Sequence, residues 1–237
     1  MKKIFSVLLA IIIIFTAAGT SFTSFAEDTA SETVITENEV TSDMPNRDDP
    51  GVIMYLCATA NSLTGHVWLY FINNTDEPVT IGYIEMQPGQ EMSVGRLRNT
   101  RKDGGGTYYN GEAMMAALDG KLDSLCKHTT SLKMVLDEEQ INTVSEKIKS
   151  MNAYEMILFN CGIFAARVWN SVSSKKIVHF IFPMLTILFM NLLPGTQKGE
   201  LRMKDPTEEG GIKPYKQTNN GVKEADVKSF NISCVNF

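Results

Sequence analysis

The stretch from Ala153 to Asn170 constrains the fold most, because its hydrophobic pattern changes period in the middle. Residues 154–159 are a short apolar run with two aromatic side chains, which predicts a buried strand. The second half has four apolar residues at the spacing of one helix face: Phe164, Ala165, Val168 and Trp169. The sequence therefore predicts a strand that leads directly into a helix.

Asn160 stands at this junction and is a candidate N-cap, which puts Cys161 in the first turn of the helix. Unpaired N–H groups and the helix dipole favour negative charge there, so we expect a thiol that is partly ionised. Cys161 is therefore a candidate nucleophile. The alternative is a buried structural cysteine, and a disulfide at Cys161 would also exclude a nucleophilic role.

The amino terminus has the pattern of a secretory signal peptide. Lys2 and Lys3 are followed by an apolar run over residues 4–15, which is shorter than the roughly 20 residues of a spanning helix. Small and hydroxyl residues then end at Ala26, where we expect cleavage. The acidic residues 27–50 contain no aromatic side chain and predict a disordered leader. We expect a secreted protein, found outside the cell or at its surface.

The distribution of charge argues against a nucleic-acid partner. The net charge is −5, of which the signal contributes +2 and the acidic leader −7, so residues 51–237 are close to neutral. A neutral domain has no electrostatic reason to bind nucleic acid.

Residues 51–97 predict an antiparallel meander. Four strand candidates are separated by turn-forming residues, at 51–60, 66–72, 79–86 and 91–97. The second candidate has apolar side chains on both faces, so we expect it to be central in its sheet.

Helices are predicted over residues 111–119 and after Asp137, which forms a capping box with Gln140. The buried stripe of the second helix has four members: Ile141, Val144, Ile148 and Met151. The predicted fold class is α+β, with a small antiparallel sheet packed against helices and the Cys161 helix central.

The end of the chain is predicted to be less ordered. Residues 177–193 are an apolar run that contains His179 and Pro183 and is short for a membrane span. We expect a buried strand or helix there, with association with a membrane as the alternative. The folded domain is predicted to cover residues 51–195, and residues 196–237 are predicted to form a polar, poorly packed tail.

The cysteines limit the kinds of site that the chain can form. The four cysteines, Cys57, Cys126, Cys161 and Cys234, form no C-x-x-C pair, so we do not expect a zinc site or a thioredoxin-like site. Nothing else in the sequence implies a metal or an organic cofactor. Their spacing leaves disulfide connectivity open.

A thiol nucleophile needs a base within hydrogen-bond reach. His128 lies in a polar segment, where we expect it to be exposed, and His179 opens the late apolar run. His66 starts a strand, and a strand end near the start of the Cys161 helix would bring imidazole and thiol together. The pairing of Cys161 with His66 is the most economical. The alternative is a His66 that only caps a turn.

Two pieces of the chain, GHVWLYFIN from Gly65 and NCGIFAARVWNSVS from Asn160, resemble secreted bacterial proteins of the circularly permuted NlpC/P60 (papain-like) group. The VTIGY…PGQEMSVG hairpin, the YYN segment at 108–110 and the capped helix fit the same layout. The resemblance covers about residues 51–174. The pair Gly162-Ile163 departs from it, since small hydroxyl residues are expected there, and so does the chain after residue 176.

The resemblance implies that Cys161 is the nucleophile and His66 the base. It also implies a third, orienting group on the next strand, for which Tyr83 and Glu85 are the candidates. Backbone N–H groups at the helix start would stabilise the oxyanion. The implied function is a secreted peptidase or amidase that cleaves an amide bond in peptide or cell-wall material such as peptidoglycan. The alternative is a non-catalytic extracellular or surface binding domain with a structural cysteine. A third interpretation is a protein associated with a membrane through residues 177–193.

Overall fold

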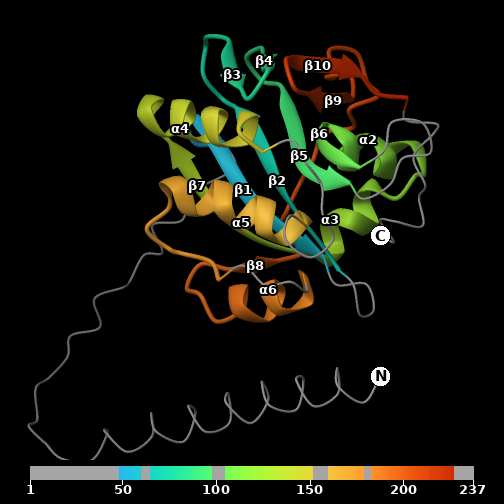
Figure 1. Ribbon diagram of the computed structural model, residues 1–237. Helices are drawn as coiled ribbons and strands as arrows, with labels where there is room; N and C mark the ends of the chain where they lie inside the picture. The colour runs from blue at the N-terminus through green and yellow to red at the C-terminus, as the bar shows by residue number, and fades with distance from the viewer. Residues whose placement is uncertain (1–47, 60–64, 98–104, 152–159, 179–182, 227–237) are drawn as a thin grey trace, which may run out of the picture. The chain divides into compact units, whose positions relative to one another are not determined.

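The fold is built on an eight-stranded antiparallel sheet, whose strands lie in the order β10-β9-β6-β5-β2-β1-β7-β8 (Figure 1). The computed structural model describes residues 48–59, 65–97, 105–151, 160–178 and 183–226. All of them belong to one compact unit, Ser42–Phe237. The predicted signal peptide and most of the acidic leader lie outside the described residues.

The strands of the main sheet are β1 (Val52–Thr59), β2 (His66–Asn73), β5 (Glu91–Leu97), β6 (Gly106–Tyr109), β7 (Thr129–Leu136), β8 (Gln197–Lys198), β9 (Tyr215–Thr218) and β10 (Gly221–Glu224). A separate hairpin consists of β3 (Val79–Ile81) and β4 (Ile84–Met86). The helices are α2 (Gly111–Leu118), α3 (Leu122–His128), α4 (Glu138–Lys149), α5 (Cys161–Val172) and α6 (Pro183–Met190). The predicted α+β class is confirmed.

Strand β2 is central, as predicted, because it pairs with β1 on one side and β5 on the other. Every residue of β2 is buried. Val67, Leu69 and Phe71 face one hydrophobic core, and Trp68, Tyr70 and Ile72 face a second core on the opposite side of the sheet. A strand with apolar side chains on both faces is stable only between two covering layers.

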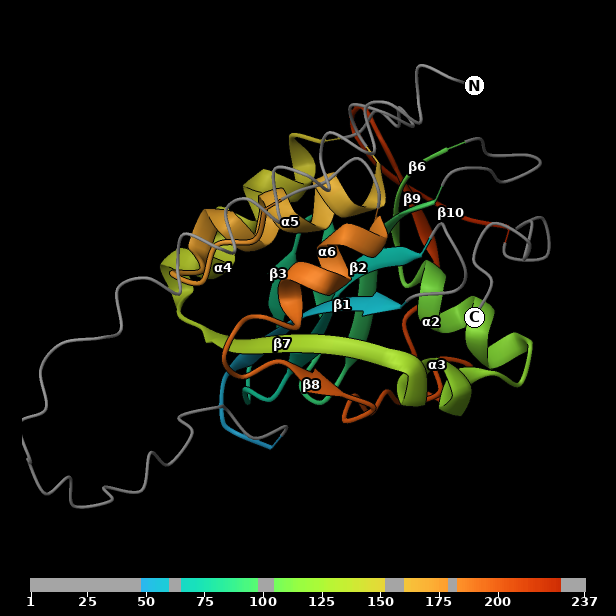
Figure 2. The same cartoon turned by 90° about the horizontal axis from the view of Figure 1, so that it is seen from below.

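Helices cover both faces of the sheet. Helices α4, α5 and α6 supply apolar side chains to the core that contains Val67, whereas α2 and α3 supply the core that contains Trp68. Figures 1 and 2 show α4 and α5 side by side over β1 and β2. The two helical layers remove both faces of β2 from water, which is the main contribution to the stability of such a fold.

The predicted caps of the two longest helices are confirmed. At the start of α4, Asp137 accepts the Gln140 N–H at 2.8 Å, and the Gln140 side chain accepts the Asp137 N–H at 3.0 Å. At the start of α5, Asn160 Oδ1 accepts the Ile163 N–H at 2.9 Å. The strand predicted over residues 154–159 lies outside the described residues.

The strand predicted over residues 79–86 is wrong, because a turn at Gly82 and Tyr83 divides it into the β3–β4 hairpin. Gly82 has a φ of +61°, and a Cβ atom there would overlap the hydroxyl of Tyr109. The backbone must therefore turn at a residue without a side chain. The next strand, β5, pairs with β2 instead of with this hairpin.

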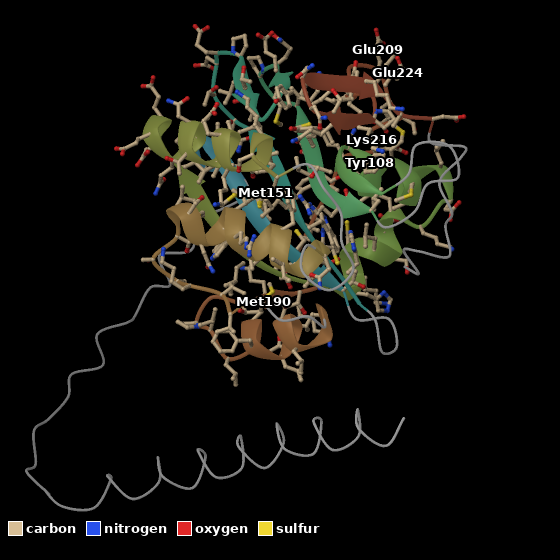
Figure 3. The ribbon with its side chains drawn as sticks, viewed as in Figure 1. Tyr108, Met151, Met190, Glu209, Lys216 and Glu224 are labelled. Atoms are coloured by element: carbon tan, nitrogen blue, oxygen red, sulfur yellow. The ribbon has the colours of Figure 1, made fainter. Side chains whose placement is uncertain are left out.

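The packed structure does not end at residue 195, as predicted, but continues to residue 226. Strand β8 pairs with β7 at one edge of the sheet, and β9 pairs with β6 near the other edge. Leu201 and Ile212, which lie between β8 and β9 in the sequence, are buried in the two cores on opposite faces of the sheet. In Figure 3, Lys216 of β9 lies beside Tyr108 of β6, with its ammonium 5.9 Å from the ring centre. A few apolar residues and backbone pairing hold this polar segment, so the sheet is larger than predicted.

The predicted apolar run at 177–193 contains α6, with Ile187 and Met190 packed into the core beside α5. Figure 3 labels Met190 on this helix. None of the helices in the described part of the chain is both long enough and apolar enough to cross a membrane.

Candidate active site

Cys161 and His66 meet where α5 and β2 begin. Cys161 is the first residue of α5 and His66 is the first residue of β2, and the thiol and the imidazole are hydrogen-bonded. Backbone N–H groups of Val67 and Gly162 also donate to the sulfur. Both side chains are mostly covered, since Cys161 and His66 are each 7% exposed. The structure thus brings together the two residues that the sequence analysis paired.

Glu112 completes a group of three. Its Oε1 lies 3.1 Å from Nε2 of His66, and the glutamate side chain is fully buried in α2. Because Nε2 faces Glu112, the other ring nitrogen, Nδ1, is the one available to the thiol. The arrangement is a Cys–His–Glu triad whose members come from a helix, a strand and a second helix.

Strand β5 makes room for the Glu112 carboxylate. Ser93 Oγ donates to Glu112 Oε2 at 3.0 Å, and a Cβ atom added to Gly95 would overlap Glu112 Oε1. The chain reaches α2 through Asn110, which has a φ of +54° and lies in the left-handed region. This turn places the start of α2 directly over the small residues of β5.

The indole ring of Trp68 stacks against the His66 imidazole. The rings of His66 and Trp68 are stacked, with centroids 5.6 Å apart and an angle of 14° between their planes. Trp68 is fully buried and pairs with Gly95 across the two strands. The flat indole surface therefore limits rotation of the imidazole ring and keeps Nε2 directed at Glu112.

The electrostatics of the pair favour separated charges. Burial alone would lower the pKa of His66, but the Cys161 thiolate and Glu112 outweigh it and raise that pKa to about 10. Burial alone would raise the pKa of Cys161, but His66 and the N–H groups of Val67 and Gly162 outweigh it and lower that pKa. Both shifts favour a thiolate beside an imidazolium at neutral pH.

Neither predicted orienting residue lies beside His66. Tyr83 lies in the turn between β3 and β4, where its ring centre is 5.5 Å from the Lys149 ammonium. Glu85 is exposed and accepts a hydrogen bond from Gln87 Nε2 at 2.8 Å. The prediction that the third group lies on the strand after His66 is therefore corrected, because Glu112 occupies that position from α2.

The sequence contains an indication of Glu112, although we expected the third group on the strand after His66. Glu112 is the one charged residue in the short apolar helix GEAMMAAL. A buried carboxylate of this kind needs polar partners. Ser93 and Gly95, which alternate with Met92 and Val94 on β5, are the small residues that receive it.

The other predicted candidates lie away from this site. His128 is exposed, as predicted, and its Nδ1 lies 2.8 Å from the Ser124 carbonyl oxygen. His179 and Cys234 lie outside the described residues. Cys57 and Cys161 are free thiols in the structure, and Cys126 is buried. Within the described part of the chain, no group of three or more His, Cys, Asp or Glu residues is placed to hold a metal ion.

No family model, curated protein or solved structure matches this chain. A thiolate at a helix start, with an imidazolium beside it and a carboxylate behind the ring, has the parts needed to attack a carbonyl group and to protonate a leaving group.

Proposed function

We propose that this protein is a secreted cysteine hydrolase that cleaves an amide bond in peptide or cell-wall material. One observation carries the proposal: the Cys161 thiol, the His66 imidazole and the Glu112 carboxylate are in hydrogen-bond contact at the start of α5. The directions of the Cys161 and His66 pKa shifts support the same reading, because they favour the charged pair that attacks carbonyl groups.

The proposed reaction has two steps. The Cys161 thiolate attacks the amide carbonyl carbon and forms a C–S bond, and the His66 imidazolium gives its proton to the amide nitrogen as the C–N bond breaks. Neutral His66 then takes a proton from water, which attacks the thioester and releases the carboxylic acid and the thiolate. An amide and one water thus give an acid and an amine. An amine acceptor in place of water would give acyl transfer through the same thioester.

Glu112 and the backbone assist without covalent chemistry. Glu112 would hold the imidazole with Nδ1 directed at sulfur and stabilise the imidazolium through Nε2. The first-turn N–H groups of α5 would stabilise the oxyanion of the tetrahedral intermediate. These groups are fixed before substrate arrives, which is the condition under which such stabilisation is most effective.

The permuted NlpC/P60-like architecture is part of this proposal. It is supported by the order of the triad, with His66 on a strand that precedes the Cys161 helix in the chain, and by an antiparallel sheet with β2 at its centre. The signal-like amino terminus supports a location outside the cell. Peptide and peptidoglycan fragments are accordingly the first substrates to test.

The decisive experiment measures the alkylation rate of Cys161 against pH in the mature protein, with Cys57, Cys126 and Cys234 replaced by alanine. We expect an apparent pKa below the ordinary value of about 8.5, and a higher one in the His66→Ala variant. A slow thiol that is indifferent to His66 would overturn the hydrolase proposal and leave a binding domain with a structural cysteine.

Hydrolysis itself is then measured with peptide and cell-wall fragments, with Cys161→Ser as the inactive control. The imidazolium must be protonated to serve the leaving amine, and the pKa of His66 is raised to about 10. The reactive pair therefore exists above the lowered Cys161 pKa and is lost as pH rises through about 10. We expect kcat/KM to fall above that pH.

A further inference from the structure

The second oxygen of Glu112 has its own partner. While Oε1 faces His66, Oε2 accepts the hydroxyl proton of Ser93 at 3.0 Å. Ser93 lies in β5 and is fully buried. Its hydroxyl is bonded to Glu112 and not to Cys161 or His66, so it can act on the reacting atoms only through Glu112.

We propose that Ser93 is a positioning residue of the active site, whose hydroxyl fixes Glu112 so that its other oxygen faces His66. The inference rests on the proposed function, since it assigns a task within that site. It concerns the orientation of the carboxylate and not the chemical steps, which belong to Cys161 and His66.

The Ser93 hydroxyl is held in one orientation. It accepts the Ala113 N–H at 3.3 Å, so its own proton is directed away from that bond and toward Glu112. Ala113 follows Glu112 in the chain, so the same hydroxyl contacts both the backbone and the side chain at the start of α2. Ser93 is fully buried, so bulk water does not reach its hydroxyl.

The backbone of Ser93 fixes the same region. The Ser93 carbonyl accepts the Asn110 N–H at 2.6 Å, and Asn110 Oδ1 accepts the Ser93 N–H at 3.4 Å. Asn110 is the left-handed residue that precedes α2. Ser93 therefore aligns both the turn before α2 and the Glu112 carboxylate, and only the second task depends on its hydroxyl.

A carboxylate held at one oxygen can rotate about its side-chain torsions, whereas contacts at both oxygens select one orientation. Without the Ser93 hydroxyl, Glu112 Oε2 would be buried without this donor and the side chain would shift toward another one. The contact with His66 Nε2 would weaken, the imidazolium would be less stable, and less Cys161 would be ionised at neutral pH.

The test compares Ser93→Ala with Ser131→Ala in the protein whose other cysteines are replaced. Ser131 is a matched control because it is a buried serine of the same sheet, 1% exposed, and its hydroxyl has no hydrogen-bond partner among the described residues. We expect Ser93→Ala to raise the apparent pKa of Cys161 alkylation and to slow alkylation at pH 7 about tenfold. Ser131→Ala should leave the profile unchanged.

A double-mutant cycle separates positioning from general destabilisation. If Ser93 acts through Glu112, Ser93→Ala should have no further effect on alkylation in a Glu112→Gln background. An equal effect in both backgrounds would overturn the inference, because it would show that Ser93 acts independently of Glu112. Circular dichroism and urea unfolding establish that each variant is folded when its thiol is measured.

The two proposals fail in different ways. A parent protein with an ordinary Cys161 pKa, indifferent to His66, would overturn the hydrolase. A parent with a low Cys161 pKa that Ser93→Ala leaves in place would overturn only the role of Ser93. The result expected from the positioning role is a Cys161 pKa that Ser93→Ala raises in the parent protein and does not raise further in a Glu112→Gln background.

Discussion

Glu112 and Glu91 are two buried glutamates on the same side of the sheet, and they differ in the groups that they contact. Glu91 accepts hydrogen bonds from the Tyr70 hydroxyl and, at 3.0 Å, from the backbone N–H of Lys204. Glu112 accepts from Ser93 and faces His66. Glu91 therefore fastens the carboxy-terminal segment to β2 and β5, whereas Glu112 contacts a ring that can change its charge. Burial and hydrogen bonding are common to both, so they do not by themselves identify a functional carboxylate.

The largest expected effect in this comparison comes from Glu112→Gln. The amide cannot stabilise the imidazolium as a carboxylate does, so the charged Cys161–His66 pair becomes less populated. We expect kcat/KM for amide cleavage to fall by about a thousandfold. The measurement is kcat/KM on the best peptide or cell-wall fragment, with the free energy of unfolding measured in parallel.

Glu91→Gln is the matched control for this experiment, since it makes the same substitution at a buried glutamate on the same side of the sheet. Its kcat/KM should remain close to that of the parent protein. Equal losses of activity in the two variants would break the comparison, because they would show that Glu112 acts only by stabilising the fold.

Gly95→Ala should have the next largest effect. The added methyl group would overlap Glu112 Oε1 and lies 3.0 Å from the Cβ of Trp68, so Glu112 must move away from His66. We expect kcat/KM to fall by about ten- to a hundredfold, with a loss of about 1–3 kcal/mol in unfolding free energy from overpacking. Steady-state kinetics and urea unfolding measure the two effects.

The control for Gly95→Ala is Gly89→Ala. Gly89 has a φ of +75°, so alanine strains the backbone there, but nothing lies within 4 Å of the added methyl group. This variant should lose stability and keep activity. If Gly95→Ala retained full activity at a reduced stability, Gly95 would have no part in placing Glu112.

Glu91→Gln should lower stability instead of activity. The amide oxygen can still accept from Tyr70 Oη and the Lys204 N–H, but it carries no charge, so both hydrogen bonds become weaker. An NH2 group also replaces Oε1, which now lies 4.0 Å from the Lys204 ammonium. We expect the free energy of unfolding to fall by about 2 kcal/mol. Urea unfolding measures it, with the exposed Glu85→Gln as a control that should cause no change. A Glu91→Gln variant as stable as the parent would show that this carboxylate does not hold the carboxy-terminal segment.

The sequence was informative where a feature depends on neighbouring residues. The cap at Asn160, the capping box at Asp137 and the two-sided burial of β2 follow from patterns within about ten residues, and the structure contains all three. Predicting that His66 lies near Cys161 required one further assumption, that a strand end meets a helix start. Two members of the triad, Cys161 and His66, could therefore be predicted from the sequence.

The position of Glu112 depends instead on contacts between distant residues. Helix α2 can approach β5 only because Gly95 lacks a side chain and because Asn110 takes a left-handed conformation. Neither condition produces a periodic pattern in the sequence. The carboxy-terminal strands were missed for a related reason, since β8 and β9 are short and polar and are held by pairing with strands that lie far away in the sequence.

The smallest expected effect is that of Tyr83→Phe, which tests the residue that the resemblance proposed for the third position. The Tyr83 ring lies against Lys149 of α4, and phenylalanine keeps that ring while removing the hydroxyl. We expect kcat/KM and the Cys161 alkylation profile to be unchanged, because Glu112 already occupies the position next to His66 Nε2. If Tyr83→Phe lost as much activity as Glu112→Gln, Tyr83 would again be the candidate for the orienting residue. If Tyr83→Phe kept full activity while Glu112→Gln lost it, the orienting role would belong to the Glu112 carboxylate.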